Sequence, residues 1–289
     1  MFDYKLLAAL TEVVHQGSFE RAAQSLALTQ SAVSQRIKLL EQRVGLPLLV
    51  RSTPVQATEE GMKLIQHSRQ VQLLERDLMT GLQQTSEQTF QTVHLAVNAD
   101  SLATWLPAIF SPLFEKNILL NFTLDDQDVT HEYLKAGSVM GCITTKQQPH
   151  QGCRSEKLGE MEYITVATPE FVDRYKNHSF SDIPTIEFGC NDNLHNEFLM
   201  EHFSLQPGQY PAHKLPSTEA FLDAARAGIA YAIAPRLQAQ PFLDTQEVIE
   251  MTPEKTITVP LYWHYWSLTS EIMEEVSHCI LKSAKQILK

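Results

Sequence analysis

Residues 18–43 read SFERAAQSLALTQSAVSQRIKLLEQR, a pattern typical of two short amphipathic helices joined by a tight turn. The apolar residues of the second helix are spaced by four, three and four positions, which places them on one buried face: Val33, Ile37, Leu40 and Val44. Ala22, Ala23 and Leu26 on the preceding helix are small or apolar, so the two helices are able to cross closely. This arrangement predicts a helix-turn-helix.

A second face of the same helix is polar and carries little charge. Its residues are short or amide-bearing, and they occur at helical spacing: Ser31, Ser34, Gln35 and Lys38. Such side chains hydrogen-bond to base edges in the major groove of DNA. We therefore take six residues as candidate DNA contacts: Gln30, Ser31, Ser34, Gln35, Arg36 and Lys38. The alternative is an ordinary helical hairpin whose polar face is only solvated.

The next segment favours DNA binding over the plain hairpin. Residues 45–51, GLPLLVR, indicate a chain reversal and a short apolar strand. After a Thr-Pro turn, residues 55–58 form a possible return strand, so the pair predicts a wing. Arg51 at the edge of this wing is a candidate phosphate contact. The winged helix-turn-helix domain is expected to span residues 1–58.

Residues 59–90 are predicted to form a linker. There is no proline between Pro54 and Pro107, and Glu59 and Glu60 suit the start of a helix. Four apolar residues give a short, imperfect heptad seam: Leu64, Val71, Leu74 and Leu78. We expect this helix to pair two chains, with residues 85–91 as a polar hinge. The alternative is a helix that packs only on its own domain.

Residues 91–289 are expected to form an α/β domain in two halves. Strand patterns occur at 93–97, 119–124 and 139–144. An apolar stripe over 102–113 predicts one helix between the first two strands, and a helical pattern at 129–136 lies between the second and the third. The resulting βαβαβ order favours a parallel sheet. The pattern restarts at 162–167 and ends with a strand at 257–264 and a helix at 272–287. Subdomain I is expected at about 91–161 and 267–289, and subdomain II at about 162–266.

At the family level the chain resembles the LysR-type transcriptional regulators. The segments that carry the resemblance to their winged helix are FERAA at 19–23, TQSAVSQRI at 29–37 and PLLVR at 47–51. Residues 95–106 and 261–264 resemble the ArgP/LysG branch, which senses lysine and arginine. Residues 148–153 and 189–195 depart from that branch. The resemblance implies a periplasmic-binding-protein-like effector domain, promoter DNA and RNA polymerase as partners, and a homodimer or homotetramer.

A ligand site is predicted where polar residues follow strands, because ligands of open α/β sheets bind beyond the carboxyl ends of the strands. Serine and threonine hydroxyls suit a carboxylate, and aspartates suit an ammonium or guanidinium group, so together they favour a basic amino acid. The alternative for each residue is a plain helix cap. The candidates are Asp100, Ser101, Asp125, Asp126, Thr144, Thr145, Ser217 and Thr218.

Composition restricts the class of protein. The 43% hydrophobic and 20% charged residues are typical of a soluble globular protein, and no apolar run approaches the roughly 20 residues that span a bilayer. The N-terminus does not resemble a secretory signal, so we expect a cytoplasmic protein without membrane contact. The four cysteines are expected to be reduced and mostly buried. Residues 1–58 carry a net charge of +2 within a total of −11, so the acidic bulk lies outside the DNA-binding segment.

No local motif of an enzyme occurs, whether nucleotide-binding, nucleophilic or zinc-protease. The sequence therefore predicts no catalytic residue, no metal site and no cofactor. Three competing functions stay open at this point. One is a LysR-type regulator with a different effector, the second is a DNA-binding protein that acts architecturally without an effector, and the third is an amino-acid-processing enzyme whose catalytic groups converge from distant positions.

Overall fold

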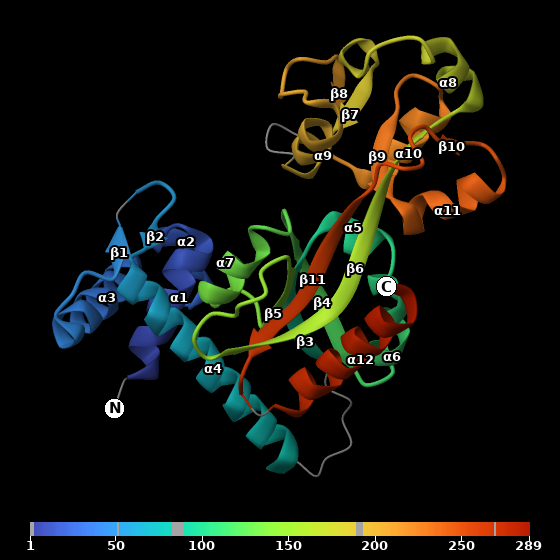
Figure 1. The fold of residues 1–289 in the computed structure, drawn as a ribbon. Helices are drawn as coiled ribbons and strands as arrows, with labels where there is room; N and C mark the ends of the chain where they lie inside the picture. Colours follow the sequence, from blue (N-terminus) through green and yellow to red (C-terminus); the bar gives the residue numbers. More distant parts are fainter. Residues whose placement is uncertain (1–2, 51, 83–89, 189–192, 269) are drawn as a thin grey trace.

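The computed structural model describes residues 3–50, 52–82, 90–188, 193–268 and 270–289. Along the chain a small helical head is followed by one long helix and then by an α/β region in two lobes (Figure 1). The mixed α/β architecture agrees with the predicted fold class.

The head contains the predicted three helices and wing. Helix α1 spans Tyr4–Gln16, α2 Phe19–Ser25 and α3 Gln30–Val44, and strands β1 (Leu49–Val50) and β2 (Gln56–Ala57) pair antiparallel. Side-chain caps start the second and third helices: Ser18 Oγ accepts from the Arg21 amide at 3.5 Å, and Thr29 Oγ1 accepts from the Ala32 amide at 3.2 Å. The predicted apolar face of α3 is buried in the core of the head, at Val33, Ile37 and Leu40.

Helix α4 (Glu59–Leu82) is the predicted long helix, and it contacts both neighbours. Its first turn is capped by Thr58, whose Oγ1 accepts from the Gly61 amide at 3.1 Å. Ile65 belongs to the core of the head, whereas Leu73 belongs to the core of the α/β region. Farther along the chain Gly137, at φ +67°, approaches so closely that an added Cβ would lie 2.8 Å from Gln66 Cα. Most of the predicted hinge lies outside the described residues.

The first half of the α/β region has the predicted parallel order. Strand β3 (Gln91–Val97) lies between β4 (Ile118–Leu124) and β5 (Gly141–Thr144) and is parallel to both. Helix α7 (Thr130–Lys135) connects β4 to β5. The single helix expected over 102–113 is wrong, because the segment divides into α5 (Ala99–Ala103), a 3-10 turn η1 (Leu106–Ile109) and α6 (Phe110–Phe114). Pro107 lacks an amide proton and disfavours helical geometry at the residue before it.

Two long antiparallel strands join the lobes. Strand β6 (Cys153–Ala167) pairs with β11 (Ile257–Trp266) along its length and then with β9 (Ala232–Pro235) and β10 (Ile249–Glu250) in the second lobe. The other end of β11 pairs with β5, so both long strands belong to both halves (Figure 1). The sequence indicated only the last part of β6, because its first residues are polar.

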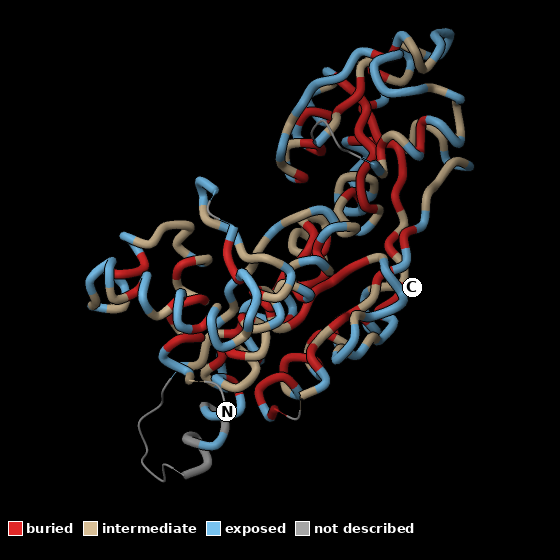
Figure 2. Tube along the Cα trace, turned by 90° about the vertical axis from the view of Figure 1, so that its left-hand side faces the viewer, coloured by how far each residue is buried: buried red, intermediate tan, exposed pale blue. Residues whose placement is uncertain are grey.

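The remaining elements cover this sheet. The second lobe also holds α8 (Pro169–Tyr175), η2 (Phe180–Asp182), β7 (Thr185–Glu187), α9 (Asn193–Phe203), β8 (Ala212–Lys214), α10 (Thr218–Arg226) and α11 (Arg236–Asp244). The final helix α12 (Glu271–Ile287) packs back on the first lobe. Figure 2 shows buried residues concentrated along the strands and on the inner side of α12. Within the described residues no helix is long and apolar enough to cross a membrane.

The cysteines in the described residues were expected to be reduced and mostly buried, but only Cys142 is buried, whereas Cys153 and Cys279 are half-buried. Cys142, Cys153 and Cys279 are free, and Cys142 is fully buried. Burial raises the pKa of the Cys153 thiol to about 11. These thiols are therefore protonated and poorly reactive at neutral pH. Cys190 lies outside the described residues.

Candidate functional site

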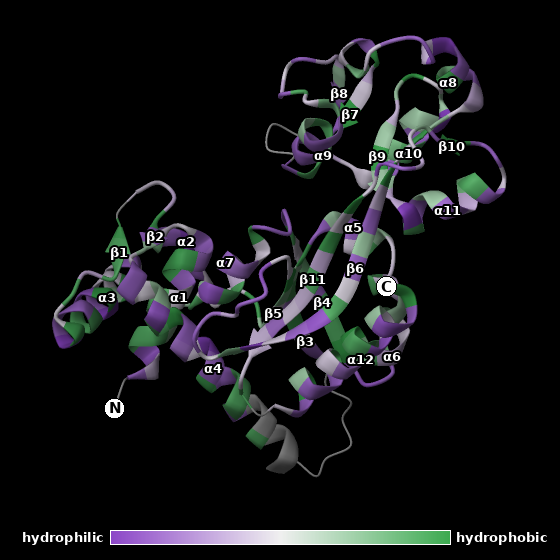
Figure 3. Ribbon diagram, viewed as in Figure 1, coloured by the Kyte–Doolittle hydropathy of each residue, from purple (hydrophilic) through white to green (hydrophobic). Residues whose placement is uncertain are grey.

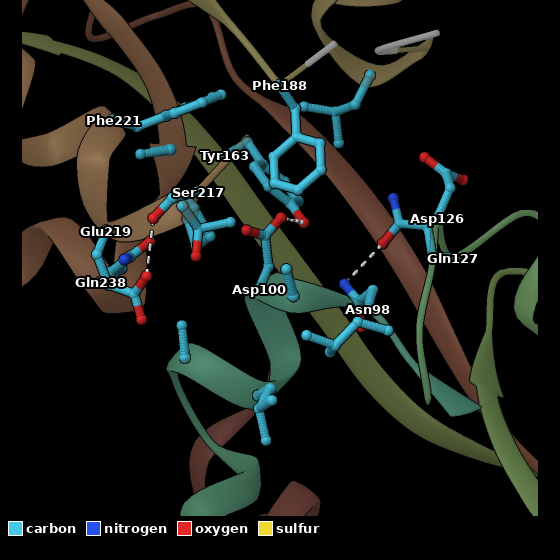
Figure 4. A pocket seen from close by; sticks show the side chains of 18 of the residues that line it. Asn98, Asp100, Asp126, Gln127, Tyr163, Phe188, Ser217, Glu219, Phe221 and Gln238 are labelled. Carbon is cyan, nitrogen blue, oxygen red and sulfur yellow. Dashed lines mark hydrogen bonds between the residues drawn. The ribbon is translucent and has the colours of Figure 1, made fainter. Parts of the chain in front are cut away.

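A cleft of about 690 Å³ lies where the two lobes meet at the crossing strands. Its lining comes from the ends of β3 and β4, from Tyr163 on β6, and from α9, α10 and α11 in the second lobe (Figure 4). A volume of this size accommodates a small molecule. The cleft therefore lies at the sheet edge where the sequence predicted a ligand.

The wall from the first lobe is built of acids and amides. Asn98 follows β3 and is 4% exposed; its amide nitrogen donates to Gln127 Oε1 at 3.1 Å. Asp125 follows β4, and its carboxylate accepts from the Asp126 amide at 2.8 Å and from the Tyr133 hydroxyl at 2.6 Å. This hydrogen bond to a carboxylate raises the pKa of Tyr133. The Asp125 carboxylate is thus held in a fixed orientation.

The crossing strand contributes one more contact to this wall. Tyr163 is 1% exposed, and its hydroxyl donates to Asp100 Oδ2 at 2.7 Å (Figure 4). Asp100 belongs to α5 in the first lobe, whereas Tyr163 belongs to a strand shared by both lobes. This hydrogen bond therefore fixes an acidic group at the base of the cleft.

The wall from the second lobe presents hydroxyls, a helix start and aromatic rings. Ser217 caps α10: its Oγ accepts from the Ala220 amide at 3.3 Å and lies 3.0 Å from Glu219 Oε2, to which it donates. The backbone amides at the start of a helix favour an anion. Phe188 and Phe221 place their ring centroids 6.4 Å apart over this side of the cleft. The wall thus presents the start of a helix, with the Glu219 carboxylate bound to the capping hydroxyl, beside an apolar surface.

Two amide oxygens in the cleft lining have no hydrogen-bond partner among the described residues. They are Asn98 Oδ1 on the first wall and Gln238 Oε1, from α11, on the second, and both are shielded from solvent. Buried polar atoms without partners are uncommon in proteins and require an explanation. A ligand could supply these donors only if the side chains turned toward the cleft.

Of the eight predicted ligand residues, five line the cleft: Asp100, Asp125, Asp126, Ser217 and Thr218. The other three predicted residues are not among the described residues that line the cleft, and they lie behind that lining. Ser101 is fully buried, Thr144 donates to the Gln127 carbonyl at 2.9 Å, and Thr145 donates to the Asp128 carboxylate. The two threonine hydroxyls support the loop that carries Gln127. A direct contact of these three residues with a ligand stays a prediction.

Sequence reasoning missed further lining residues. Asn98, Gln127 and Glu219 are close neighbours of predicted residues, so a wider window around each strand end would have included them. Residues on separate elements gave no local signal, because only the tertiary fold brings them to the cleft. These are Tyr163, Phe188, His195, Phe221 and Gln238.

The candidate DNA-binding residues lie together on the outer side of α3. Five of them are exposed and Arg36 is half-buried; the exposed ones are Gln30, Ser31, Ser34, Gln35 and Lys38. Figure 3 shows hydrophilic residues alternating with hydrophobic ones along α3, as the predicted two faces require. Arg51 lies outside the described residues.

Comparison with known proteins shows the family. Residues 4–62 match the family described as bacterial regulatory helix-turn-helix protein, lysR family, and residues 86–281 match the LysR substrate binding domain. The chain belongs to the LysR family of transcriptional regulators. This LysR-type chain therefore combines a DNA-binding head with a domain for a small-molecule effector, and the plain hairpin and enzyme interpretations are set aside.

Relatives and solved structures match the LysR-type chain over its full length. The HTH-type transcriptional regulator ArgP of Aeromonas salmonicida is 40% identical, with 99% of this chain and 98% of the relative covered. The crystal structure of ArgP from Mycobacterium tuberculosis is similar with a TM-score of 0.88 and 36% identity, covering 100% and 99% of the two chains. Full-length LysG from Corynebacterium glutamicum with bound effector Arg is similar with a TM-score of 0.83 and 32% identity, covering 100% of both.

Proposed function

We propose that this LysR-type regulator responds to a basic amino acid, L-arginine or L-lysine, bound in the cleft between its lobes. The observation that carries the proposal is the opposition of the two walls, since acids and amides face a helix start with hydroxyls across one cavity. An amino acid with a cationic side chain has matching charges at its two ends. The similarity to LysG, solved with bound Arg, supports the same class of ligand.

The ligand is proposed to lie across the cleft. Ser217, Thr218 and the first amides of α10 would hold the α-carboxylate, because the helix dipole and free amides favour an anion there. Asp125 and Asp126 would hold the cationic groups, with Asp100 as a further acid at the base. The Phe188 and Phe221 rings would cover the aliphatic part of the side chain.

The head is proposed to bind promoter DNA with α3 in the major groove. The polar face of α3 is exposed and supplies amide and hydroxyl groups for base edges, while Lys38 and Arg36 supply positive charge. Arg51 in the wing is proposed to contact a phosphate. Because the head carries few net positive charges, several heads acting together would bind more tightly than one.

Oligomer formation is proposed to run through α4. Leu74 is 42% and Leu78 61% exposed, so the distal half of the predicted heptad seam is open to a second chain. A homodimer formed this way, or a homotetramer of two such pairs, would place several heads on one promoter in the cytoplasm and present them to RNA polymerase. Regulated genes are proposed to serve export or metabolism of basic amino acids.

The effector assignment is tested by calorimetric titration of the full chain with L-arginine, L-lysine and the uncharged analogue L-citrulline. We expect saturable binding of arginine or lysine and at least roughly tenfold weaker binding of citrulline, because the neutral ureido group loses the charge-assisted hydrogen bonds. Equal binding of citrulline would contradict a role for the acidic wall. If neither basic amino acid binds while DNA binding persists, a LysR-type regulator with another effector replaces this proposal.

DNA footprinting with and without the bound amino acid separates regulation from a purely architectural role. A ligand changes the arrangement of the heads only if it binds two arrangements with different affinity. We expect arginine or lysine to alter the protected region or the affinity for promoter DNA. An unchanged footprint at saturating ligand would favour the architectural role.

A further inference from the structure

A cluster of two histidines and a glutamate lies outside the cleft, at the start of α7. His131 and Glu132 are consecutive residues of α7, and His150 comes from the loop between β5 and β6. Each of the three offers one possible ligand atom, and these atoms lie within 4.8 Å of one another. The His131 and His150 rings are stacked at 5.5 Å with an interplanar angle of 14°, and His131 Nε2 lies 3.2 Å from Glu132 Oε1.

The unusual feature of this cluster is a pair of ring nitrogens shielded from solvent. Neither His131 Nδ1 nor His150 Nε2 has a hydrogen-bond partner among the described residues, although both rings are only partly buried as a whole. A shielded polar atom without a hydrogen-bond partner is energetically unfavourable. A bound ion is one of the recognised explanations for such atoms. The histidine pair therefore points to a ligand independently of the spacing of the three side chains.

We propose that His131, Glu132 and His150 form a binding site for one divalent transition-metal ion, with Zn²⁺ as the best fit. Two imidazole nitrogens and one carboxylate oxygen are donors that Zn²⁺ commonly takes in proteins, and three protein ligands leave a fourth position for water. Hard cations such as Mg²⁺ prefer oxygen donors and fit this set less well. The site is new relative to the effector cleft, since none of its residues lines the cleft.

The geometry requires only side-chain rotation to close around an ion. With ligand bonds of about 2.0–2.1 Å, tetrahedral donors lie roughly 3.4 Å apart, so three atoms that now lie within 4.8 Å of one another need to approach by at most about 1.4 Å. Glu132 is 51% exposed and its other neighbour, Lys135, is 56% exposed, so both have room to reorient. Lys135 Nζ lies 3.3 Å from Glu132 Oε2 and would move away from the incoming positive charge.

Sequence reasoning had no access to this site. His131 and His150 are separated by a strand and a loop, a spacing that matches no local metal motif. The expectation of no metal site therefore rested on local spacing, whereas the cluster forms through the packing of α7 against the loop that contains His150.

The test is calorimetric titration of ZnCl₂ into the untagged full-length protein after treatment with a chelator. We expect saturable binding of one Zn²⁺ per chain. His131→Ala and His150→Ala should each weaken it more than roughly 100-fold, because loss of a ligand exceeds the 10–100-fold effect of an outer partner. His278→Ala is the matched control, since this exposed histidine lies on α12 and should leave binding unchanged. Absence of saturable binding, or binding that survives both His131→Ala and His150→Ala, would overturn the proposal.

A second measurement does not depend on variants that fold. X-ray absorption at the zinc edge of the wild-type complex should show two imidazole nitrogens and additional oxygen donors in the coordination sphere. A sphere without two imidazoles would overturn the site even if Zn²⁺ binds. Glu132→Gln changes an exposed residue and should weaken Zn²⁺ binding without lowering the melting temperature of the chelator-treated protein.

Discussion

The two walls of the cleft differ in chemistry and in the way they are held. The first wall consists of acids and amides bound to one another and to Tyr133 and Tyr163, whereas the second combines a helix start with a capping hydroxyl, the side chains of Glu219 and Gln238, and two aromatic rings. A cleft whose two walls carried the same charge would bind ions of the opposite charge without distinguishing among them. We expect opposed walls to favour a molecule with both charges at a fixed separation, so that the specificity of this cleft would depend on the distance between the lobes.

The largest expected effect comes from neutralising the acidic wall. In the double variant Asp125→Asn and Asp126→Asn, the affinity for L-arginine or L-lysine should fall roughly 100-fold, since hydrogen bonds to charged groups contribute about 1.5–3 kcal/mol. Calorimetric titration measures the change. Asp173→Asn is the control, because this exposed carboxylate lies on α8 and does not line the cleft. An unchanged affinity in the double variant would remove these acids from the effector site.

A smaller loss is expected on the opposite wall. Ser217→Gly removes the hydroxyl and should weaken effector binding roughly fivefold to tenfold, in keeping with about 1 kcal/mol for a hydrogen bond. Glycine is tolerated as a helix cap at a cost of a few tenths of a kcal/mol, so the melting temperature should hardly change. Ser18→Gly makes the same substitution at the cap of α2 in the head. A loss of affinity in that control would mean that capping, rather than ligand contact, explains the effect.

Tyr163→Phe tests the contact between the acidic wall and the crossing strand. The ring stays in place, but Asp100 loses a 2.7 Å hydrogen bond from a buried hydroxyl. We expect effector affinity to fall about threefold, because Asp100 would then be less fixed at the base of the cleft. Wild-type affinity in the variant would show that the orientation of Asp100 is irrelevant to binding.

The smallest expected effect is a change in the pH dependence of stability, and it concerns Glu162, the residue before Tyr163. A hydrogen bond from Lys289, together with the guanidinium of Arg236, lowers the pKa of Glu162 against the opposing effect of burial. A carboxyl whose pKa is lowered on folding stabilises the protein above its unfolded pKa, near 4.5, and this stabilisation is lost as the pH falls through the folded value. Glu162→Gln should therefore reduce stability at neutral pH slightly and flatten the acid side of the stability profile. Thermal unfolding at pH values from neutral to acid checks this, and an unchanged profile would contradict it.

The helices of the head and α4 were predictable because their signals are local. Each signal is contained in a few neighbouring residues: the apolar stripe of α3, the caps at Ser18 and Thr29, and the acidic start of α4. The polar residues at the strand ends of the cleft were predictable from the same kind of local signal. Tyr163 and Gln238 were not predictable, because nothing in the sequence around them indicates that β6 and α11 meet at one cavity. Pro107 is a local signal too, and it interrupts the helix that the apolar stripe over 102–113 predicts.

Helix α7 and the residues just after it join the cleft wall to the linker helix. Tyr133 hydrogen-bonds to Asp125, and four residues later Gly137 lies against Gln66 and accepts from the Arg69 guanidinium of α4. Glycine is needed at this position, since any side chain would collide with the backbone of α4. The acidic wall and α4, the long helix that follows the DNA-binding head, are therefore connected through about one turn of chain, from Tyr133 to Gly137. We expect a displacement of that wall to move α4 as well, because Gly137 lies directly against the backbone of α4.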